Sequence, residues 1–223
     1  MTLNDELAAQ RQAAYERRTP EQREIQRETM ALVEKSGVAD TALAVGDLAA
    51  DFSLQNAVGE TVSLMALLAH GPVVISFYRG GWCPYCNLEL RALQAKLEDI
   101  HDAGAELVAI SPEQPDSSLD TAEKNSLQFP VLSDVGNAVA RKFGLVHAIN
   151  PEWVQYQLSR GTDVAARNAS DVAEVPLPAT YVVRQDGVIT FAVVNADYTQ
   201  RAEPEDVLRA LVAEVSLRPT EAR

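Results

Sequence analysis

Two cysteines lie three residues apart in this chain, and they are its only cysteines. Cys83 and Cys86 stand in the segment Trp82-Cys83-Pro84-Tyr85-Cys86, where an apolar run ends and a helical pattern begins at Pro84. Two thiols at a strand-to-helix turn can form and break a disulfide without moving the rest of the protein. The pair is therefore a candidate redox centre rather than a structural crosslink.

The start of a helix favours ionised sulfur. If the helix begins at Pro84, Cys83 is its N-cap residue and Cys86 occupies the third helical position. Unpaired backbone N–H groups and the positive end of the helix dipole then favour a thiolate at Cys83. The spacing also suits disulfide geometry. Pro84 stiffens the turn and lacks only an N–H group that needs no partner there.

The cysteine pair could also be inert or bind a metal. Two unrelated buried cysteines could stand at this spacing, although inert thiols rarely gather at a helix start. A zinc half-site would need two more ligands, but the chain has no second Cys pair, and His70, His101 and His147 are scattered. A redox dithiol is the favoured hypothesis, and its chemistry requires no cofactor and no metal.

Elements that could position the pair alternate along the chain. Strands are predicted at 51–54, 60–62, 73–78, 106–110, 131–132, 180–183 and 188–194, the last two as a hairpin around Asp186-Gly187. Helices are predicted at 64–69, 84–103, from 117 or 118, 135–143, from 150, and 203–215, with a mobile loop at 159–175. This order predicts a three-layer α/β sandwich, with a mainly parallel central sheet and an antiparallel edge.

The first 36 residues predict a helical extension to a domain spanning 45–215. Thr19 followed by Pro20 and Gln22 is a helix-start pattern, and Gly37 is a stop signal. A thin apolar stripe on this helix leads us to expect packing on the domain or on a second subunit, which would make a homodimer.

Composition excludes some partners. The formal net charge of −13 argues against binding nucleic acid or an anionic membrane, because both require basic patches. No secretory signal is visible at the N-terminus, and no apolar run is long enough to span a bilayer. With one close cysteine pair, we expect a reducing cytoplasmic compartment.

The segment 77–86, with Pro178 ahead of a strand, resembles the thioredoxin superfamily. Over a longer stretch, from Val45 to Val215, the chain resembles the peroxiredoxin (alkyl hydroperoxide reductase/thiol-specific antioxidant, AhpC/TSA) family. The matching pieces are Asp51-Phe52-Ser53-Leu54, Phe77-Tyr78, Val108-Ala109-Ile110-Ser111, Phe129-Pro130-Val131-Leu132-Ser133-Asp134 and Phe143-Gly144. The resemblance implies a thioredoxin-like sandwich, a peroxide or disulfide substrate, and a thioredoxin- or glutathione-type reductant.

The chain departs from the family pattern at the sulfurs. The resemblance puts Cys86 at the position of the family's peroxide-attacking cysteine, Cys83 at that of a Thr hydroxyl and Arg79 at that of a proline. Pro178 falls where the family has a late arginine and where thioredoxins keep a cis-proline, so we expect a cis bond there. Helix-end electrostatics favours Cys83 as nucleophile towards disulfides, whereas for peroxide the choice between the cysteines stays open.

For other residues that could belong to the site, two interpretations compete. Arg79 either stabilises a thiolate or a peroxide, or is a solvated charge at a strand end. Trp82 either shields the disulfide and offers a docking surface, or only packs. Trp153 and Tyr156, at helical spacing, are expected in the core, and Asp197-Tyr198 has no assigned chemistry. Three functions follow: a peroxidase cycling Cys83 and Cys86, a thiol–disulfide oxidoreductase with little peroxidase activity, and a non-catalytic binding module with a thioredoxin fold.

Overall fold

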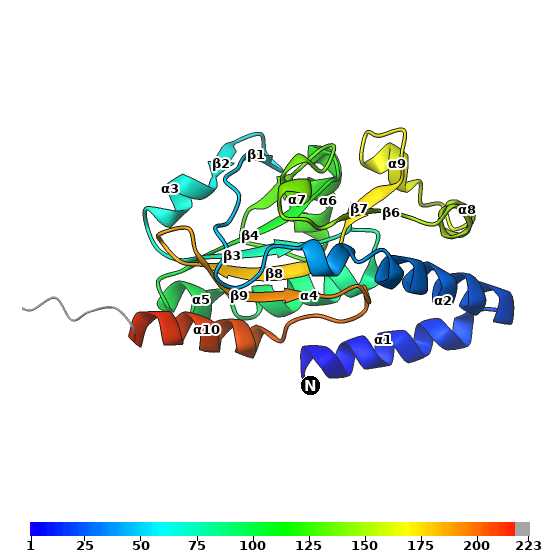
Figure 1. Ribbon diagram of the computed structural model, residues 1–223, viewed down its shortest axis with the longest axis horizontal. Helices are drawn as coiled ribbons and strands as arrows, with labels where there is room; N and C mark the ends of the chain where they lie inside the picture. Colours follow the sequence, from blue (N-terminus) through cyan, green and yellow to red (C-terminus); the bar gives the residue numbers. More distant parts are fainter. Residues whose placement is uncertain (217–223) are drawn as a thin grey trace, which may run out of the picture.

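A seven-stranded mixed sheet forms the centre of the molecule in the computed structural model, which describes residues 1–216. Its strand order is β2-β1-β5-β4-β3-β8-β9 (Figure 1). The strands are β1 (Ser53–Asn56), β2 (Thr61–Ser63), β3 (Val73–Phe77), β4 (Glu106–Ser111), β5 (Val131–Ser133), β8 (Ala179–Val183) and β9 (Ile189–Val194). A separate two-stranded ribbon pairs β6 (Val146–Ala148) with β7 (Glu174–Pro176).

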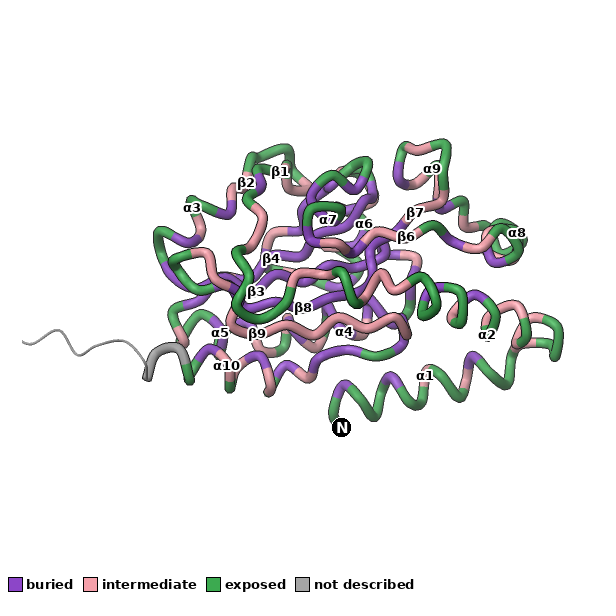
Figure 2. Tube along the Cα trace, in the orientation of Figure 1, coloured by how far each residue is buried: buried purple, intermediate pink, exposed green. Residues whose placement is uncertain are grey.

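Helices cover both faces of the sheet, as predicted for a three-layer sandwich. One face packs against α4 (Pro84–Gln94), α5 (Leu97–Asp102) and α10 (Pro204–Ser216), and the other against α3 (Leu64–Leu68) and α7 (Ala138–Lys142). The remaining helices of the domain are α6 (Pro115–Lys124), α8 (Pro151–Ser159) and α9 (Val164–Arg167). Figure 2 shows the buried strands between layers whose outer surfaces are exposed.

The predicted parallel character of the sheet was overstated. Only β3, β4 and β5 are mutually parallel, while β1 joins β5 antiparallel, β8 joins β3 antiparallel, and each edge strand belongs to a hairpin. Every residue of β3 is buried, and alternate side chains enter the two cores, with Val74 on the α4 side and Ile75 on the α7 side. A strand fixed on both faces provides a rigid base for the turn that follows it.

The N-terminal segment forms two helices, α1 (Leu3–Arg17) and α2 (Pro20–Lys35), followed by a short 3-10 turn at Val38–Thr41. Thr19 caps α2 in a reciprocal capping box with Gln22, as the sequence predicts. Leu3 and Leu7 are buried in the same core as α4, so the extension packs on its own domain. A homodimer stays a prediction.

Several predicted boundaries are wrong. The helix expected over 84–103 is interrupted at Ala95 and Lys96, giving α4 and α5, and α6 begins at Pro115 after Gln114 rather than at Ser117 or Ser118. The segment 159–175, expected to be a loop, contains α9 and the start of β7. These short elements carry too few residues for a hydrophobic period to be read from sequence.

Among residues 1–216, no helix is both long and apolar enough to cross a bilayer.

Candidate active site

The two cysteines lie at the start of α4, directly after the turn that leaves β3. Cys83 is the N-cap residue with extended backbone (φ −88°, ψ 115°), and Pro84 is the first helical residue. Cys86 therefore occupies the third helical position, as predicted. No side chain forms a capping hydrogen bond at this helix end, and the backbone N–H of Cys86 donates to the Cys83 sulfur.

Close packing fixes the turn before Cys83. Gly80 has a φ of +142°, and a Cβ built on it would lie 2.4 Å from Nε1 of Trp82. A Cβ on Gly81 would lie 2.1 Å from Oγ1 of Thr121, in α6. Because only glycine fits at both positions, the Gly-Gly pair lets the chain pass closely under α6 before it enters α4.

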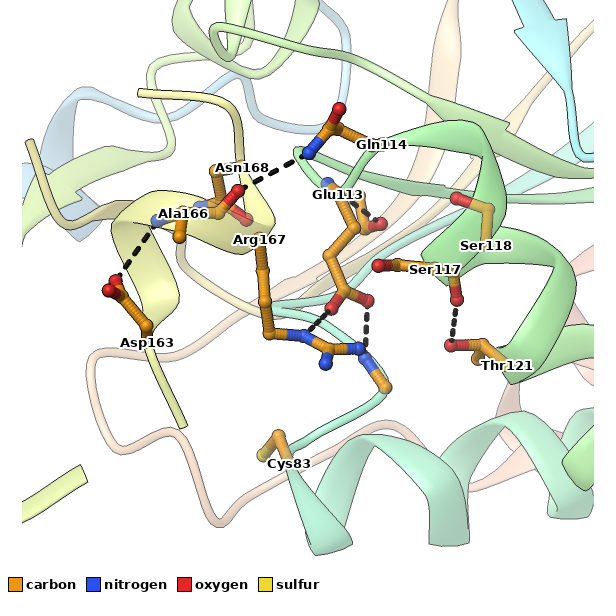
Figure 3. A network of polar contacts seen from close by, with 12 residues as sticks. Cys83, Glu113, Gln114, Ser117, Ser118, Thr121, Asp163, Ala166, Arg167 and Asn168 are labelled. Atoms are coloured by element: carbon orange, nitrogen blue, oxygen red, sulfur yellow. Dashed lines mark hydrogen bonds and ion pairs between the residues drawn. The ribbon is translucent and has the colours of Figure 1, made fainter. Parts of the chain in front are cut away.

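Glu113, a buried carboxylate, anchors the same turn. Its Oε2 accepts a hydrogen bond from the Gly81 backbone N–H (2.6 Å), and its Oε1 accepts one from Nε of Arg167 in α9 (2.5 Å). Figure 3 shows Arg167 reaching Glu113 beside Cys83 at the start of α4. Burial raises the pKa of Glu113, opposed by these two donors. The network ties the segment 159–175 to the cysteine turn.

Both sulfurs are buried as free thiols, with Cys83 1% exposed and Cys86 0% exposed. Burial by itself raises the pKa of Cys83, but hydrogen bonding with Cys86 and the charges of Arg79 and Arg201 outweigh burial and lower the pKa to about 5. Burial and the neighbouring Cys83 raise the pKa of Cys86 well above its ordinary value. These opposite directions favour Cys83 over Cys86 as the ionised sulfur of the pair.

Sequence reasoning missed an arginine that contacts the second sulfur. Arg201, in the loop after β9, donates from one guanidinium nitrogen to Sγ of Cys86 (3.4 Å) and from Nε to Oε2 of Glu89 (2.5 Å). The Thr180 hydroxyl also donates a hydrogen bond to Oε1 of Glu89 (3.0 Å). Burial raises the pKa of Glu89 to about 7, against the Arg201 charge. The sequence does not predict that Arg201 lies at the cysteines, because the loop that contains it has no regular hydrophobic pattern.

Arg79 is buried, with 2% of its surface exposed, so it is not the solvated charge that was one of the two predictions. Its guanidinium lies over the ring of Tyr198 (4.3 Å to the centroid) and over that of Trp82 (4.9 Å). Its charge lowers the pKa of Cys83. Tyr198, to which no chemistry was assigned from sequence, is therefore part of the site and also accepts a hydrogen bond from the amide of Gln26 (2.8 Å).

A cavity of about 170 Å³ opens beside Cys83. Its walls come from the cysteine turn, from α1 and from α8, and they include Trp82, Pro84, Trp153, Tyr156 and Tyr198. Trp153 is buried in the core, as expected from its spacing, yet it and Tyr156 also line this cavity, which the sequence did not indicate. Four arginines complete the lining: Arg17, Arg18, Arg79 and Arg160. We call this space the arginine cavity.

The prediction of a cis bond before Pro178 is wrong. Residues 1–216 contain no cis peptide bond, and Pro178, although buried, is not among the residues that line the arginine cavity. The Leu177–Pro178 bond is trans, Leu177 N–H donates to Leu145 O (2.8 Å), and β8 begins at Ala179 directly after Pro178. The guanidinium that contacts Cys86 comes from Arg201.

Metal-ligating side chains do not gather around the cysteines or the histidines: within residues 1–216, no group of three or more His, Cys, Asp and Glu side chains is arranged to hold a metal ion.

Comparison with known proteins agrees with this architecture. The model of the AhpC/TSA family matches residues 45–192. Peroxiredoxin Q, chloroplastic, of Populus jackii is 35% identical over 100 residues, covering 45% of this chain and 46% of that protein. Peroxiredoxin Bcp of Escherichia coli K12 is 32% identical over 103 residues, covering 46% of this chain and 65% of that protein. The chain thus spans about half to two thirds of the length of these curated relatives.

Solved structures show the same fold. Peroxidoxin BcpB from Mycobacterium tuberculosis superposes with a TM-score of 0.61 at 23% identity, covering 79% of this chain and 99% of that one. Xanthomonas campestris peroxiredoxin Q superposes with a TM-score of 0.57 at 23% identity, covering 78% and 98%. Because the family model spans well over half of the chain and includes both cysteines, the protein belongs to the AhpC/TSA family.

Proposed function

We propose that the protein is a thiol-dependent peroxidase that reduces hydrogen peroxide or alkyl hydroperoxides through a Cys83–Cys86 dithiol/disulfide cycle. The observation that carries the proposal is the free dithiol at a helix start, with Arg79 and Arg201 both acting on its charge. The membership of the AhpC/TSA family supports a peroxide as the substrate.

Cys83 is the attacking sulfur in this proposal. Its thiolate attacks one peroxide oxygen, the O–O bond breaks, and the released alkoxide or hydroxide takes a proton to become alcohol or water. Cys83 is left as a sulfenic acid. The Cys86 thiol then loses its proton and attacks the Cys83 sulfur, and the hydroxyl departs with that proton as water. The disulfide so formed joins residues already in contact through hydrogen bonding.

Each arginine has a distinct part in this cycle. Arg79 stabilises the Cys83 thiolate before attack, since its charge lowers the pKa of that thiol. Arg201 stabilises the negative charge that Cys86 acquires as it resolves the sulfenic acid, because its guanidinium contacts that sulfur. Glu89 holds Arg201 in place through its carboxylate, so we assign Glu89 a positioning role.

The two other functions predicted from sequence have less support. Exchange with a protein disulfide requires a partner's sulfur to reach Cys83, which is 1% exposed behind α1 and α8. A purely binding module would have no use for a cysteine whose pKa lies near 5. We further propose a reducing compartment such as the cytoplasm, where the dithiol can be regenerated.

Peroxide consumption tests this function. With dithiothreitol as reductant, the wild type should consume hydrogen peroxide catalytically and, without reductant, should accumulate the intramolecular disulfide, seen by mass spectrometry after alkylation. The Cys83→Ser/Cys86→Ser double variant should consume none above background. Equal peroxide consumption by the wild type and the double variant would contradict the proposal.

A further inference from the structure

The arginine cavity is positively charged in a protein whose formal net charge is −13. Acidic residues outnumber basic ones by 32 to 19 in the whole chain, yet no Asp or Glu of the described residues lines this space. A cavity lined by one sign of charge concentrates ligands of the opposite sign. The feature therefore points to an anionic ligand rather than to a neutral one.

The cavity arginines lack carboxylate partners. Within residues 1–216, the buried Nε of Arg79 has no acceptor, and its guanidinium lies over the rings of Tyr198 and Trp82. Arg18 donates only to the neutral amide of Gln26, and its Nε is also without an acceptor. In the dithiol form the Cys83 thiolate balances the charge of Arg79, and a buried guanidinium that loses its anion is costly, so the site favours a negatively charged group once that thiolate is consumed.

The charge of the cavity depends on the redox state of the cysteines. In the dithiol form, the Cys83 thiolate supplies a negative charge to which Arg79 is coupled. In the disulfide form that thiolate is gone, and the cavity carries one more uncompensated positive charge. An anionic ligand consequently binds better after the cysteines have been oxidised, which is when the reductant must enter.

The walls restrict which reductants can reach the sulfur. Cys83 is 1% exposed and lies at a cavity of about 170 Å³ walled by α1 on one side and by the rings of Trp153 and Tyr156 on another. A small molecule can enter this space, whereas the broad surface of a protein reductant meets the helices first. The aromatic rings can pack against the aliphatic part of such a molecule.

Building on the proposed peroxidase cycle, we propose that the arginine cavity binds a small carboxylate-bearing thiol, which reduces the Cys83–Cys86 disulfide. In the disulfide form, the carboxylate takes the place of the Cys83 thiolate as the counter-ion of Arg79. The thiolate of this ligand attacks Sγ of Cys83, the S–S bond breaks, and Cys86 leaves with the electron pair and gains a proton. A second molecule of thiol attacks the mixed disulfide, which releases the ligand as its own disulfide and restores Cys83.

A binding experiment tests the redox dependence without catalysis. The disulfide form is prepared with diamide, and 3-(methylthio)propionate, which has a carboxylate but no thiol, is titrated against both forms. Trp82 and Trp153, the two tryptophans of the chain, line the cavity and report binding by fluorescence. We expect an affinity at least about fivefold higher for the disulfide form and no binding of the methyl ester. Equal affinity for both forms, or none, would overturn the proposal.

A kinetic experiment tests the charge preference. The diamide-formed disulfide is reduced with 3-mercaptopropionate, 2-mercaptoethanol or cysteamine, and rates are compared per thiolate. We expect 3-mercaptopropionate to be fastest by about tenfold, with the preference lost at high salt and in Arg17→Gln/Arg160→Gln, two exposed residues of the cavity rim. Arg209→Gln, which removes an exposed arginine of α10, should retain the preference.

The outcomes separate this proposal from the proposed function. A wild type that forms the disulfide with peroxide and is reduced by dithiothreitol, yet shows no preference for the carboxylate thiol, overturns the inference alone. Failure to form the disulfide with peroxide contradicts the peroxidase instead. A preference for carboxylate-bearing over neutral hydroperoxides in the oxidation step, with none among thiols, would assign the cavity to the peroxide and overturn its assignment to the reductant.

Discussion

The guanidinium of Arg201 lies 3.4 Å from the sulfur of Cys86, although 115 residues separate them in the chain. Arg201 reaches this point because Glu89, one turn further along α4 than Cys86, accepts from its Nε at 2.5 Å. Both partners of this ion pair are buried, with side chains no more than 2% exposed. The loop after β9 is thereby fastened to the helix that carries the dithiol.

Removing one partner of this pair should destabilise the protein more than removing both. Arg201→Gln leaves the Glu89 carboxylate buried without a counter-ion, so we expect a loss of about 3–5 kcal/mol in the free energy of unfolding. Arg201→Gln/Glu89→Gln should be less destabilised than Arg201→Gln alone, and far less than the sum of the single variants, as measured by urea denaturation. Arg209→Gln, whose pair with Asp206 is exposed, serves as the control and should change little. Strict additivity would show that the two buried charges are not coupled.

The reactivity of Cys83 should persist well below neutral pH. A thiol whose pKa is about 5 is largely thiolate at pH 6, whereas an ordinary cysteine is not. Iodoacetamide alkylation of Cys86→Ser, followed against pH, should show a midpoint below that of an ordinary cysteine, because the charges of Arg79 and Arg201 remain and the Ser hydroxyl can still donate to Cys83. Arg79→Gln should raise the midpoint, because it removes a charge that favours the thiolate, and Arg27→Gln, on the exposed face of α2, should not. A midpoint near 9 in Cys86→Ser would contradict this electrostatic assignment.

The same pKa makes the stability of the dithiol form depend on pH. The folded-state pKa of Cys83 is lowered from 9.0 to about 5, so between these values the folded chain binds fewer protons than the unfolded one. This contribution is therefore fully present above pH 9 and is lost as the pH falls to 5. As the pH rises from 5 to 9, the free energy of unfolding of the reduced wild type should increase relative to that of Cys83→Ser. Denaturation in a reducing buffer measures this difference. A pH-independent difference would contradict the assignment.

A side chain on Gly81 should disturb the site through packing alone. The Cβ of Gly81→Ala would meet Oγ1 of Thr121 at 2.1 Å, so the turn must shift away from α6. We expect a loss of about 1–3 kcal/mol in the free energy of unfolding and slower disulfide formation with peroxide. Thr121→Ala in the Gly81→Ala background removes Oγ1, the atom that the added Cβ would meet at 2.1 Å, and should recover part of the lost stability. No recovery in the double variant would show that this contact is not the cause of the loss.

Local sequence patterns predicted the features that depend on residues close together in the chain. The N-cap position of Cys83 and the third position of Cys86 follow from Pro84 alone, and the fold follows from the alternation of strands and helices. Arg201 and Tyr198 could not be predicted, because the loop that carries them has no hydrophobic period and is placed by the pair with Glu89. The arginine cavity was also hidden, since α1, α8 and the cysteine turn meet only through tertiary packing.

The attack of Cys83 on peroxide is the central step, and trapping of the sulfenic acid tests it most directly. Cys86→Ser and Cys83→Ser are each exposed to one equivalent of hydrogen peroxide in the presence of dimedone, and the adduct is located by mass spectrometry. We predict rapid adduct formation on Cys83 in the first variant and little on Cys86 in the second. Rapid adduct formation on Cys86 in Cys83→Ser, with none on Cys83 in Cys86→Ser, would contradict the proposed order of attack.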